Sequence, residues 1–389
     1  MATGLYIAMV FHPNPLSGVA EHTHQMARHL TELGEDVTVL APALPEATKF
    51  DGDCGYPVVR FDTKLPAGKW IKSRLDRRLI LFGIFKCVLS LKPDYIILDM
   101  WGPLASLSAI LVSRLYNIPL FVFAHGPDLN QPRYKKYIRR AVLSAVSRVI
   151  CVSEYTRSFL LKWGVEPQRV VTIYSGFDIR EVEAYRSRNY RGRFPLVDSA
   201  FPDGHPTVLS VSRLVQGKGI HRVIEAMPKV ISEVPEARYI IVGGGGGNFE
   251  IQLRELAEAS SEKESITFLG PLAGSQKFEC FNRCDVFALP SEGEAFGIVF
   301  AEAMGFGKPV IGGRSGGAME VIVPGENGLL VDSNDVEEIA DAIIYLLKNP
   351  DEARRLGENG RRRVENELNW TMSANKLRSV IYDVLGKSR

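Results

Sequence analysis

The sequence predicts two doubly wound α/β domains, each built on a parallel sheet. Short apolar runs alternate with amphipathic helical patterns from the first residues onward, as in chains of parallel βα units. The length of 389 residues exceeds what a single hydrophobic core usually serves. The alternation stops over residues 180–206, where charge, proline and glycine mix without a steady period, and then resumes. We therefore expect domains over residues 1–182 and 183–370, joined through a connecting segment at 180–206.

In the first domain the strands are expected where short apolar, β-branched runs stand between turn residues. These runs are residues 5–11, 36–40, 95–98, 119–124, 148–152 and 170–174. A helix is expected between the first two strands, since Val19, Thr23, Met26, Leu30 and Leu33 share one face and Gly34 follows as a C-terminal signal.

In the second domain the same reasoning places strands at residues 207–211, 239–242, 266–269, 286–289 and 309–311, each followed by helical spacing. No repeat of fixed period is present, and residues 243–247 are a run of five glycines.

The composition limits the classes of function. A formal net charge of +2 lacks the concentrated basic footprint of a nucleic-acid-binding protein, so no nucleic-acid partner is expected. No secretory signal or run of about 18 apolar residues is seen, which favours a soluble or peripheral protein. The cysteines form no C-x-x-C pair and fit a reducing cytoplasm; they are Cys54, Cys87, Cys151, Cys280 and Cys284.

Candidate site residues of the first domain follow its strands, because open α/β sheets bind ligands beyond the carboxyl ends of their strands. Gly18 opens the first helix, where its backbone can approach a phosphate or sugar closely. A plain tight turn is the alternative. His125, in the sequence AHGPD with Asp128, can hydrogen-bond a sugar hydroxyl or handle a proton. The alternative is a histidine satisfied by the local backbone.

Two cations follow the first strand of the second domain. Arg213 and Lys218 project from one loop, with Gly217 and Gly219 beside Lys218. A guanidinium can grip a diphosphate with two hydrogen bonds, and an ammonium can meet it as a point charge. This pair would stabilise a departing nucleoside diphosphate. Two ordinary surface cations are the alternative.

Two glutamates separated by seven residues are the most informative feature of the second domain. Glu294 lies in a loop and Glu302 on the helix that follows, so their carboxylates can lie about 10 Å apart. One can accept from a hexose and the other from a ribose, while the backbone N–H groups of residues 295–299 face phosphates. The chain is therefore expected to bind a nucleotide sugar. The alternative is a solvated loop charge and an exposed helix residue.

Together these motifs resemble those of the retaining glycosyltransferases of family four. That family has the GT-B architecture, in which two Rossmann-like domains face each other across a cleft. The resemblance spans nearly the whole chain and is densest in SRLVQGKG, the glycine run, FLGPL, DVFALPSEGEAFGIVFAEAMGFGKPVI and GGAMEVIVPGENGLLVD. The family's last helix crosses back to the first domain, and residues 371–389 are expected to do so here.

The resemblance implies roles for the candidate residues. Glu294 would contact the transferred hexose and Glu302 the ribose, and Arg213 and Lys218 would hold the diphosphate. His125 would stand near the hydroxyl groups of the sugar. The other implied donor contacts are Gly18, Leu269 in the loop that reads the base, Phe296, Gly297 and Ile298. His125, Glu294, Arg213 and Lys218 are the expected catalytic set. Ser17 stands where many members of the family have the first glycine of a pair.

The resemblance also implies a front-face reaction with retained anomeric configuration, in which the leaving diphosphate helps to deprotonate the acceptor hydroxyl. No metal or other cofactor is expected, because Asp51 and Asp53 have D-x-D spacing but lie in a polar loop without further ligands. A nucleotide-sugar-binding regulator, an epimerase or a glycan phosphorylase on the same fold are alternatives.

The acceptor is expected to be a glycan, a lipid-linked sugar or a small molecule. Residues 64–92 combine cations with apolar residues, and a second basic cluster spans residues 133–140, so contact with anionic lipid at the cytoplasmic face is one expectation. An ordinary helix with a solvated basic side is the alternative. The GGRSGGAMEVI tract resembles that of mannosyltransferases that use GDP-mannose, whereas users of UDP-sugars share much of it.

Overall fold

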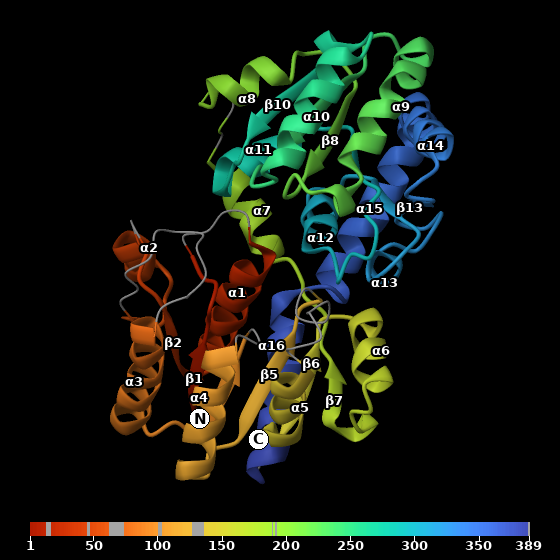
Figure 1. The fold of residues 1–389 in the computed structure, drawn as a ribbon. Helices are drawn as coiled ribbons and strands as arrows, with labels where there is room; N and C mark the ends of the chain where they lie inside the picture. Colours follow the sequence, from red (N-terminus) through yellow and green to blue (C-terminus); the bar gives the residue numbers. More distant parts are fainter. Residues whose placement is uncertain are drawn as a thin grey trace. The chain divides into compact units, whose positions relative to one another are not determined.

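A computed structural model describes residues 1–12, 17–44, 47–61, 74–99, 103–126, 136–188, 190 and 193–387. The chain folds into two compact units (Figure 1). The first unit comprises Met1–Ser175 together with Trp370–Arg389, and the second comprises Gly176–Asn369. The first division lies after Ser175, whereas the sequence places it after residue 182.

The first unit is built on a parallel sheet whose described strands run in the order β3-β2-β1-β4-β5-β6-β7. Every pair in this sheet is parallel, and Gly4 lies opposite Val37 on one side and Tyr95 on the other. The strands are β1 (Thr3–Ile7), β2 (Asp36–Pro42), β3 (Val58–Phe61), β4 (Tyr95–Leu98), β5 (Leu120–Ala124), β6 (Arg148–Cys151) and β7 (Val170–Thr172).

The helices of the first unit cover the sheet with apolar faces. They are α1 (Gly18–Glu32), α2 (Ala47–Asp53), α3 (Arg74–Leu91), α4 (Pro103–Tyr116), α5 (Lys136–Ala145), α6 (Glu154–Lys162) and α16 (Trp370–Leu385). The expected first helix is α1, which Ser17 caps by accepting from the Ala20 N–H at 3.2 Å. The last helix, α16, packs on α1, and Arg378 pairs at 2.6 Å with the buried carboxylate of Glu35.

The second unit carries a parallel sheet in the order β10-β9-β8-β11-β12-β13. Its strands are β8 (Thr207–Val211), β9 (Arg238–Val242), β10 (Ile266–Gly270), β11 (Val286–Leu289), β12 (Val310–Gly313) and β13 (Gly328–Val331). Its helices are α7 (Ile179–Arg186), α8 (Pro195–Ala200), α9 (Ile220–Glu233), α10 (Asn248–Ala259), α11 (Gly274–Arg283), α12 (Ile298–Gly305), α13 (Ala318–Val321), α14 (Val336–Lys348) and α15 (Pro350–Asn366).

The structure corrects three expectations. The first strand ends at Ile7 and does not continue to residue 11. Strands β3 and β13 were not expected, because each is a four-residue edge strand, the first interrupted by Arg60 and the second opened by Gly328. Residues 180–206 are not a plain connecting segment, because they hold most of α7 and all of α8, which both contact α11 in the second unit.

The strand orders locate where ligands are expected to bind. In each sheet the order reverses beside the first strand, between β1 and β4 and between β8 and β11. Parallel sheets of this kind bind ligands at the carboxyl ends of the strands that flank such a reversal. None of the described helices is long and apolar enough to cross a membrane.

Candidate functional site

In the second unit, the loops after β8 and β11 meet at the reversal of strand order. The Glu292 N–H donates to the Gly217 carbonyl at 2.8 Å. Gly219 has a φ of 72°, and a Cβ there would lie 2.2 Å from the Pro290 carbonyl oxygen. Only glycine allows this approach, so the glycine after Lys218 holds the two loops together.

Lys218 and Glu294 form an ion pair across these loops. Lys218 Nζ lies 2.5 Å from Glu294 Oε2, and the two side chains are 21% and 13% exposed. Ser291 Oγ lies 3.4 Å from the same oxygen. Burial alone would raise the pKa of the Glu294 carboxyl, but Lys218, Ser291 and the Ala295 N–H together hold it below its ordinary value. Glu294 is therefore a mostly buried, ionised carboxylate and not a solvated loop charge.

Backbone contacts fix the loop that carries Glu294. The Gly317 N–H donates to the Glu294 carbonyl at 2.6 Å, and a Cβ at Gly316 would lie 2.5 Å from that oxygen. Gly297 caps α12 with a φ of 92°, and a Cβ there would meet the Phe300 ring at 2.5 Å. Phe296 is buried, and Ile298 begins α12. The fixed carboxylate of Glu294 therefore lies just before the N-terminus of α12, which begins at Ile298.

Glu302 lies in the second turn of α12 and is buried, with 6% of its surface exposed. Lys277 Nζ, from α11, lies 2.7 Å from Glu302 Oε1. Both expected glutamates are therefore paired with a lysine, and Glu302 is not an exposed helix residue. Lys277 was missed by the sequence analysis. Its position three residues after the FLGPLAG sequence, near the start of the helix that follows a strand, is the only signal in the sequence.

The other donor-binding candidates of this unit differ in their surroundings. The Arg213 side chain is exposed and has no hydrogen-bond or ion-pair partner among the residues that the structure describes. Leu269 is buried inside β10 and does not lie in the loop that follows. The glycine run at residues 243–247 supports the loop that carries Arg213 and Lys218, because the Leu214 N–H donates to the Gly244 carbonyl at 3.2 Å.

In the first unit, Gly18 forms the first residue of α1. A Cβ at Gly18 would meet nothing within 4 Å among the described atoms, and its φ is not in the left-handed region. The fold itself therefore does not require glycine here. An approaching ligand would be a reason for a bare backbone at the start of this helix.

His125 belongs to a buried cluster at the carboxyl ends of β4 and β5. His125 Nε2 lies 2.9 Å from Oδ1 of Asp99, which directly follows β4 and is fully buried. Thr23 Oγ1, from α1, donates to Asp99 Oδ2 at 2.5 Å. His125 is thus not merely satisfied by the local backbone, because a carboxylate orients its ring. The sequence analysis missed Asp99, although its place directly after an expected strand is the signal used for the other candidates.

His22, on α1, completes this cluster. Its ring packs against Phe123, His125 and Trp370, and within the described part of the chain neither ring nitrogen has a hydrogen-bond partner. Burial, and next the neighbouring His125, hold the pKa of His22 well below its ordinary value, so the ring is neutral. His22 Nδ1 lies 3.8 Å from Asp99 Oδ1.

Two groups of residues bear on metal binding. One ligand atom from each of His22, Asp99 and His125 lies within 4.8 Å of the others, which by distance alone suits a metal ion. Asp51, the first residue of the D-x-D spacing, pairs with Arg60, whose Nη2 lies 2.6 Å from Asp51 Oδ1.

Part of the expected acceptor region lies outside the described residues. This applies to Asp128, to residues 64–73 and to residues 133–135. The described cations of the two basic segments include Lys86, Lys92 and Arg140, which are all exposed.

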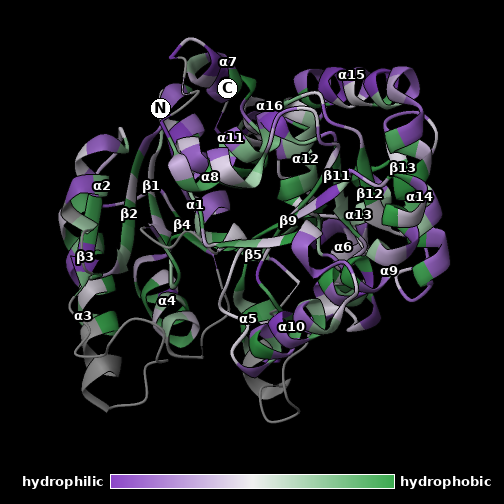
Figure 2. Cartoon of the chain, turned by 90° about the horizontal axis from the view of Figure 1, so that it is seen from above, coloured by the Kyte–Doolittle hydropathy of each residue, from purple (hydrophilic) through white to green (hydrophobic). Residues whose placement is uncertain are grey.

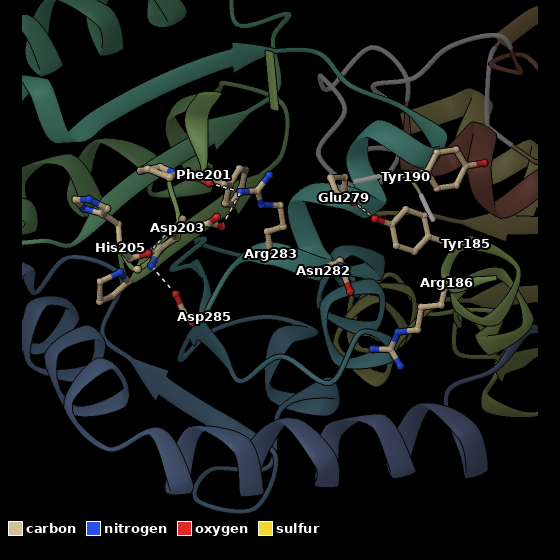
Figure 3. A pocket seen from close by; sticks show the side chains of 14 residues that line it. Tyr185, Arg186, Tyr190, Phe201, Asp203, His205, Glu279, Asn282, Arg283 and Asp285 are labelled. Carbon is tan, nitrogen blue, oxygen red and sulfur yellow. Dashed lines mark hydrogen bonds and ion pairs between the residues drawn. The ribbon is translucent and has the colours of Figure 1, made fainter. Parts of the chain in front are cut away.

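A cavity of about 670 Å³ lies elsewhere in the second unit. Thr207 and Asp285, which line it, stand at the amino ends of β8 and β11, so it opens at the opposite edge of the sheet from Lys218 and Glu294. Figure 3 shows Asn282 and Arg283 between Asp285 on one side and Tyr185 and Arg186 on the other. This cavity is separate from the candidate donor site.

Comparisons with known proteins identify the class. The family model described as "Glycosyltransferase Family 4" matches residues 16–181, and the model "Glycosyl transferases group 1" matches residues 196–363. In structure, HepE from Anabaena in complex with UDP-glucose is similar with a TM-score of 0.80, at 20% identity over 98% of this chain and 100% of that chain. The protein therefore has the two-domain α/β GT-B fold, as the resemblance implied.

The most informative relatives are mannosyltransferases. A GDP-mannose-dependent α-(1-6)-phosphatidylinositol monomannoside mannosyltransferase from Mycobacterium tuberculosis is 31% identical over 88% of each chain. A GDP-mannose-dependent monoacylated α-(1-6)-phosphatidylinositol monomannoside mannosyltransferase from Corynebacterium glutamicum is 32% identical, over 62% of this chain and 64% of that protein. The chain belongs to the family-four glycosyltransferases and is a glycosyltransferase enzyme that acts on nucleotide sugars.

Proposed function

We propose that this enzyme transfers mannose from GDP-mannose to a hydroxyl group of a lipid-linked acceptor. The names of the relatives from Mycobacterium tuberculosis and Corynebacterium glutamicum support this donor and this class of acceptor. We further propose that the anomeric configuration is retained and that no metal ion takes part.

The main support for the proposed donor site is that Glu294 and Glu302 are each paired with a lysine. The Lys218 to Glu294 distance is 2.5 Å and the Lys277 to Glu302 distance is 2.7 Å. Pairing with lysine fixes each carboxylate in place, so each can accept hydrogen bonds from hydroxyl groups without reorganisation. In the proposal Glu294 accepts from the hexose and Glu302 from the ribose.

The exposed guanidinium of Arg213 has the role of binding the diphosphate. Unlike Lys218, it has no partner among the described residues, so its five N–H donors are available to phosphate oxygens. As the bond between the anomeric carbon and the phosphate oxygen breaks, charge builds up on the diphosphate and Arg213 and Lys218 stabilise it. The acceptor oxygen bonds to the anomeric carbon on the same face, and its proton passes to the leaving diphosphate.

In the first unit, His125 is proposed to hydrogen-bond a hydroxyl of the transferred sugar. Asp99 accepts from His125 Nε2 at 2.9 Å and so fixes the ring orientation. Asp99 is a positioning residue in this scheme.

Donor binding is tested by calorimetry with GDP-mannose, UDP-glucose and UDP-N-acetylglucosamine. We expect GDP-mannose to bind, and Glu302→Gln to weaken it at least tenfold. The matched control is Glu279→Gln, since Glu279 is also a buried glutamate of this unit but bonds to Tyr185 near the separate cavity. Equal effects of the two variants, or binding of none of these donors, would contradict the donor site.

The chemistry is tested separately with a lipid-linked mannoside acceptor. Proton NMR of the product is expected to show an α-mannoside, and chelators are expected to leave the rate unchanged. Preference for a UDP-sugar would replace the proposed donor. Tight donor binding without transfer to any acceptor would favour the nucleotide-sugar-binding regulator.

A further inference from the structure

The solvent-facing stripe of α4 is apolar, which is unusual for a surface helix. Leu107, Leu111 and Leu115 recur every four residues and are 47%, 46% and 61% exposed. The α4 residues 105, 106, 108–110, 112 and 113 are buried, because α4 packs between α3 and α5. The free stripe of a helix packed on a sheet is ordinarily polar.

The neighbouring helix α3 extends this surface. Phe82 and Leu89 are 68% and 59% exposed. Lys86 lies between them, about one helical turn from each. Tyr116, at the end of α4, is 43% exposed, and its ring lies 6.2 Å from that of Phe85 on α3. The two helices lie side by side (Figure 1), and much of both is coloured as hydrophobic in Figure 2. We call Phe82, Leu89, Leu107, Leu111, Leu115 and Tyr116 the α3/α4 face.

On α3 after Asp76, on α4 and on α5, the charged residues are all cations. Lys86 and Arg114 lie within the α3/α4 face, and Lys92 and Arg140 are exposed at the end of α3 and on α5. The sequences of α4 and α5 contain no aspartate or glutamate, and α3 has none after Asp76. Elsewhere in the described part of the chain, exposed large apolar side chains are scattered singly, for example Ile251 on α10.

We infer that the α3/α4 face docks on the surface of an anionic lipid bilayer. Leucine and phenylalanine side chains enter the boundary between headgroups and acyl chains, while the cations remain among the headgroups. The positive charge favours an anionic lipid surface over a protein partner. A protein partner would need carboxylates at fixed matching positions, whereas anionic lipid headgroups diffuse laterally and can pair with each cation where it lies. This inference rests on the proposed lipid-linked acceptor, which such docking would bring within reach of the enzyme.

The test is flotation of the full chain with vesicles of phosphatidylcholine alone or of phosphatidylcholine mixed with phosphatidylglycerol. We expect binding only to the mixed vesicles, weakened by salt. Leu111→Glu is expected to lower the partition coefficient at least tenfold, because it places a charge among the acyl chains. The matched control, Ile251→Glu, replaces an apolar residue of the second unit that is 58% exposed, and it is expected to bind as the wild type does.

A second pair of variants tests the charge. Each cation near an anionic surface raises the partition coefficient about fivefold. Lys86→Gln is therefore expected to lower the partition coefficient about fivefold. Lys376→Gln, on α16, is the control, because α16 packs on α1 and not on α3 or α4.

Three results would overturn the inference. The first is that the wild type does not bind mixed vesicles at low salt. The second is that Leu111→Glu and Ile251→Glu lose equal amounts of binding. The third is that the wild type sediments as a dimer and does not bind vesicles, while Leu111→Glu sediments as a monomer. GDP-mannose affinity is measured in parallel. If the wild type binds GDP-mannose but not vesicles, the inference about the α3/α4 face is wrong and the proposed function stands. If the wild type does not bind GDP-mannose, the proposed function is wrong.

Discussion

At the scale of single residues, the site depends on which charges are paired. Lys218 serves two needs, because it neutralises the buried Glu294 and lies in the loop proposed to meet the diphosphate. Arg213, five residues earlier, is unpaired in the described structure and exposed. Lys218 therefore has an internal partner, whereas the guanidinium of Arg213 is exposed to solvent.

Replacing Lys218 is expected to change the pH dependence of donor binding. In Lys218→Ala the burial of Glu294 is no longer opposed by the ammonium, so the pKa of this carboxyl rises and it protonates at a higher pH. We expect about tenfold or greater loss of GDP-mannose affinity at pH 7, with an acid limb that begins at higher pH than in the wild type. Calorimetry across pH 4.5 to 8 measures both. Lys218→Arg keeps the charge and should restore the acid limb; an unchanged acid limb in Lys218→Ala would contradict the assigned pairing.

Asp99 is expected to affect turnover more than donor affinity. In Asp99→Asn the hydrogen bond to His125 Nε2 loses its charge, so the imidazole is less firmly oriented. We expect kcat to fall about 10-fold to 100-fold, with a KM for donor within a factor of about three. Thr23→Ala, which removes the other hydrogen bond to Asp99, is the control and should have a smaller effect. Equal reductions of kcat in the two variants would indicate general damage to the cluster.

At the scale of elements, glycines hold the strand-to-helix loops of the second unit in place. The segments around Gly219, Gly297 and Gly316 all approach neighbouring groups so closely that a Cβ would clash. They surround Glu294, so the position of this carboxylate depends on contacts between loops that follow different strands. The rigidity of the site comes from this set of backbone contacts.

Comparing Gly316→Ala with Gly325→Ala separates the cost of backbone strain from the cost of a steric clash with the Glu294 loop. Both glycines have a positive φ, of 69° and 74°, so alanine costs about 1 to 2 kcal/mol of stability at either site. Only at Gly316 would the new Cβ also meet backbone, 2.5 Å from the Glu294 carbonyl oxygen. We expect Gly316→Ala to lower both the unfolding midpoint in urea and GDP-mannose affinity, and Gly325→Ala to lower only the midpoint. Wild-type donor affinity in Gly316→Ala would show that the loop tolerates displacement.

At the scale of the whole molecule, the two units can be monitored separately. All four tryptophans, Trp70, Trp101, Trp163 and Trp370, belong to the first unit. Tryptophan fluorescence therefore reports the unfolding of this unit alone. The same unit contains buried histidines on α1 whose pKa values are lowered.

The first unit is expected to lose stability as the pH falls below about 6.5. Burial holds the pKa of His22 well below its ordinary value and lowers that of His24 to about 4. The unfolded chain binds these protons near pH 6.5, so the unfolded state holds more protons between pH 6.5 and 4 and stability falls across this window. The urea midpoint, followed by tryptophan fluorescence, should decrease over that range. His22→Phe should flatten this decrease, and an equally steep decrease in this variant would exclude His22 as a cause.

The sequence by itself determined the α/β class, the first helix and most strands, because those depend on the local spacing of apolar residues and on turn signals. It also located the two glutamates, Arg213, Lys218 and His125, because functional side chains follow strands at one edge of the sheet. Their roles in binding remain predictions. The edge strands β3 and β13 and the short helices α7 and α8 were missed, because their local patterns are weak.

Only the tertiary structure decided which side chains meet. Lys218 and Glu294 are 76 residues apart in the chain, Lys277 and Glu302 are 25 apart, and His125 and Asp99 are 26 apart. Glu35 and Arg378 are 343 residues apart, and their pairing joins α16 to the first unit. Such contacts follow from the order in which strands pair and from the direction in which each loop leaves the sheet. These are properties of the assembled sheet, and no local period in the sequence encodes them.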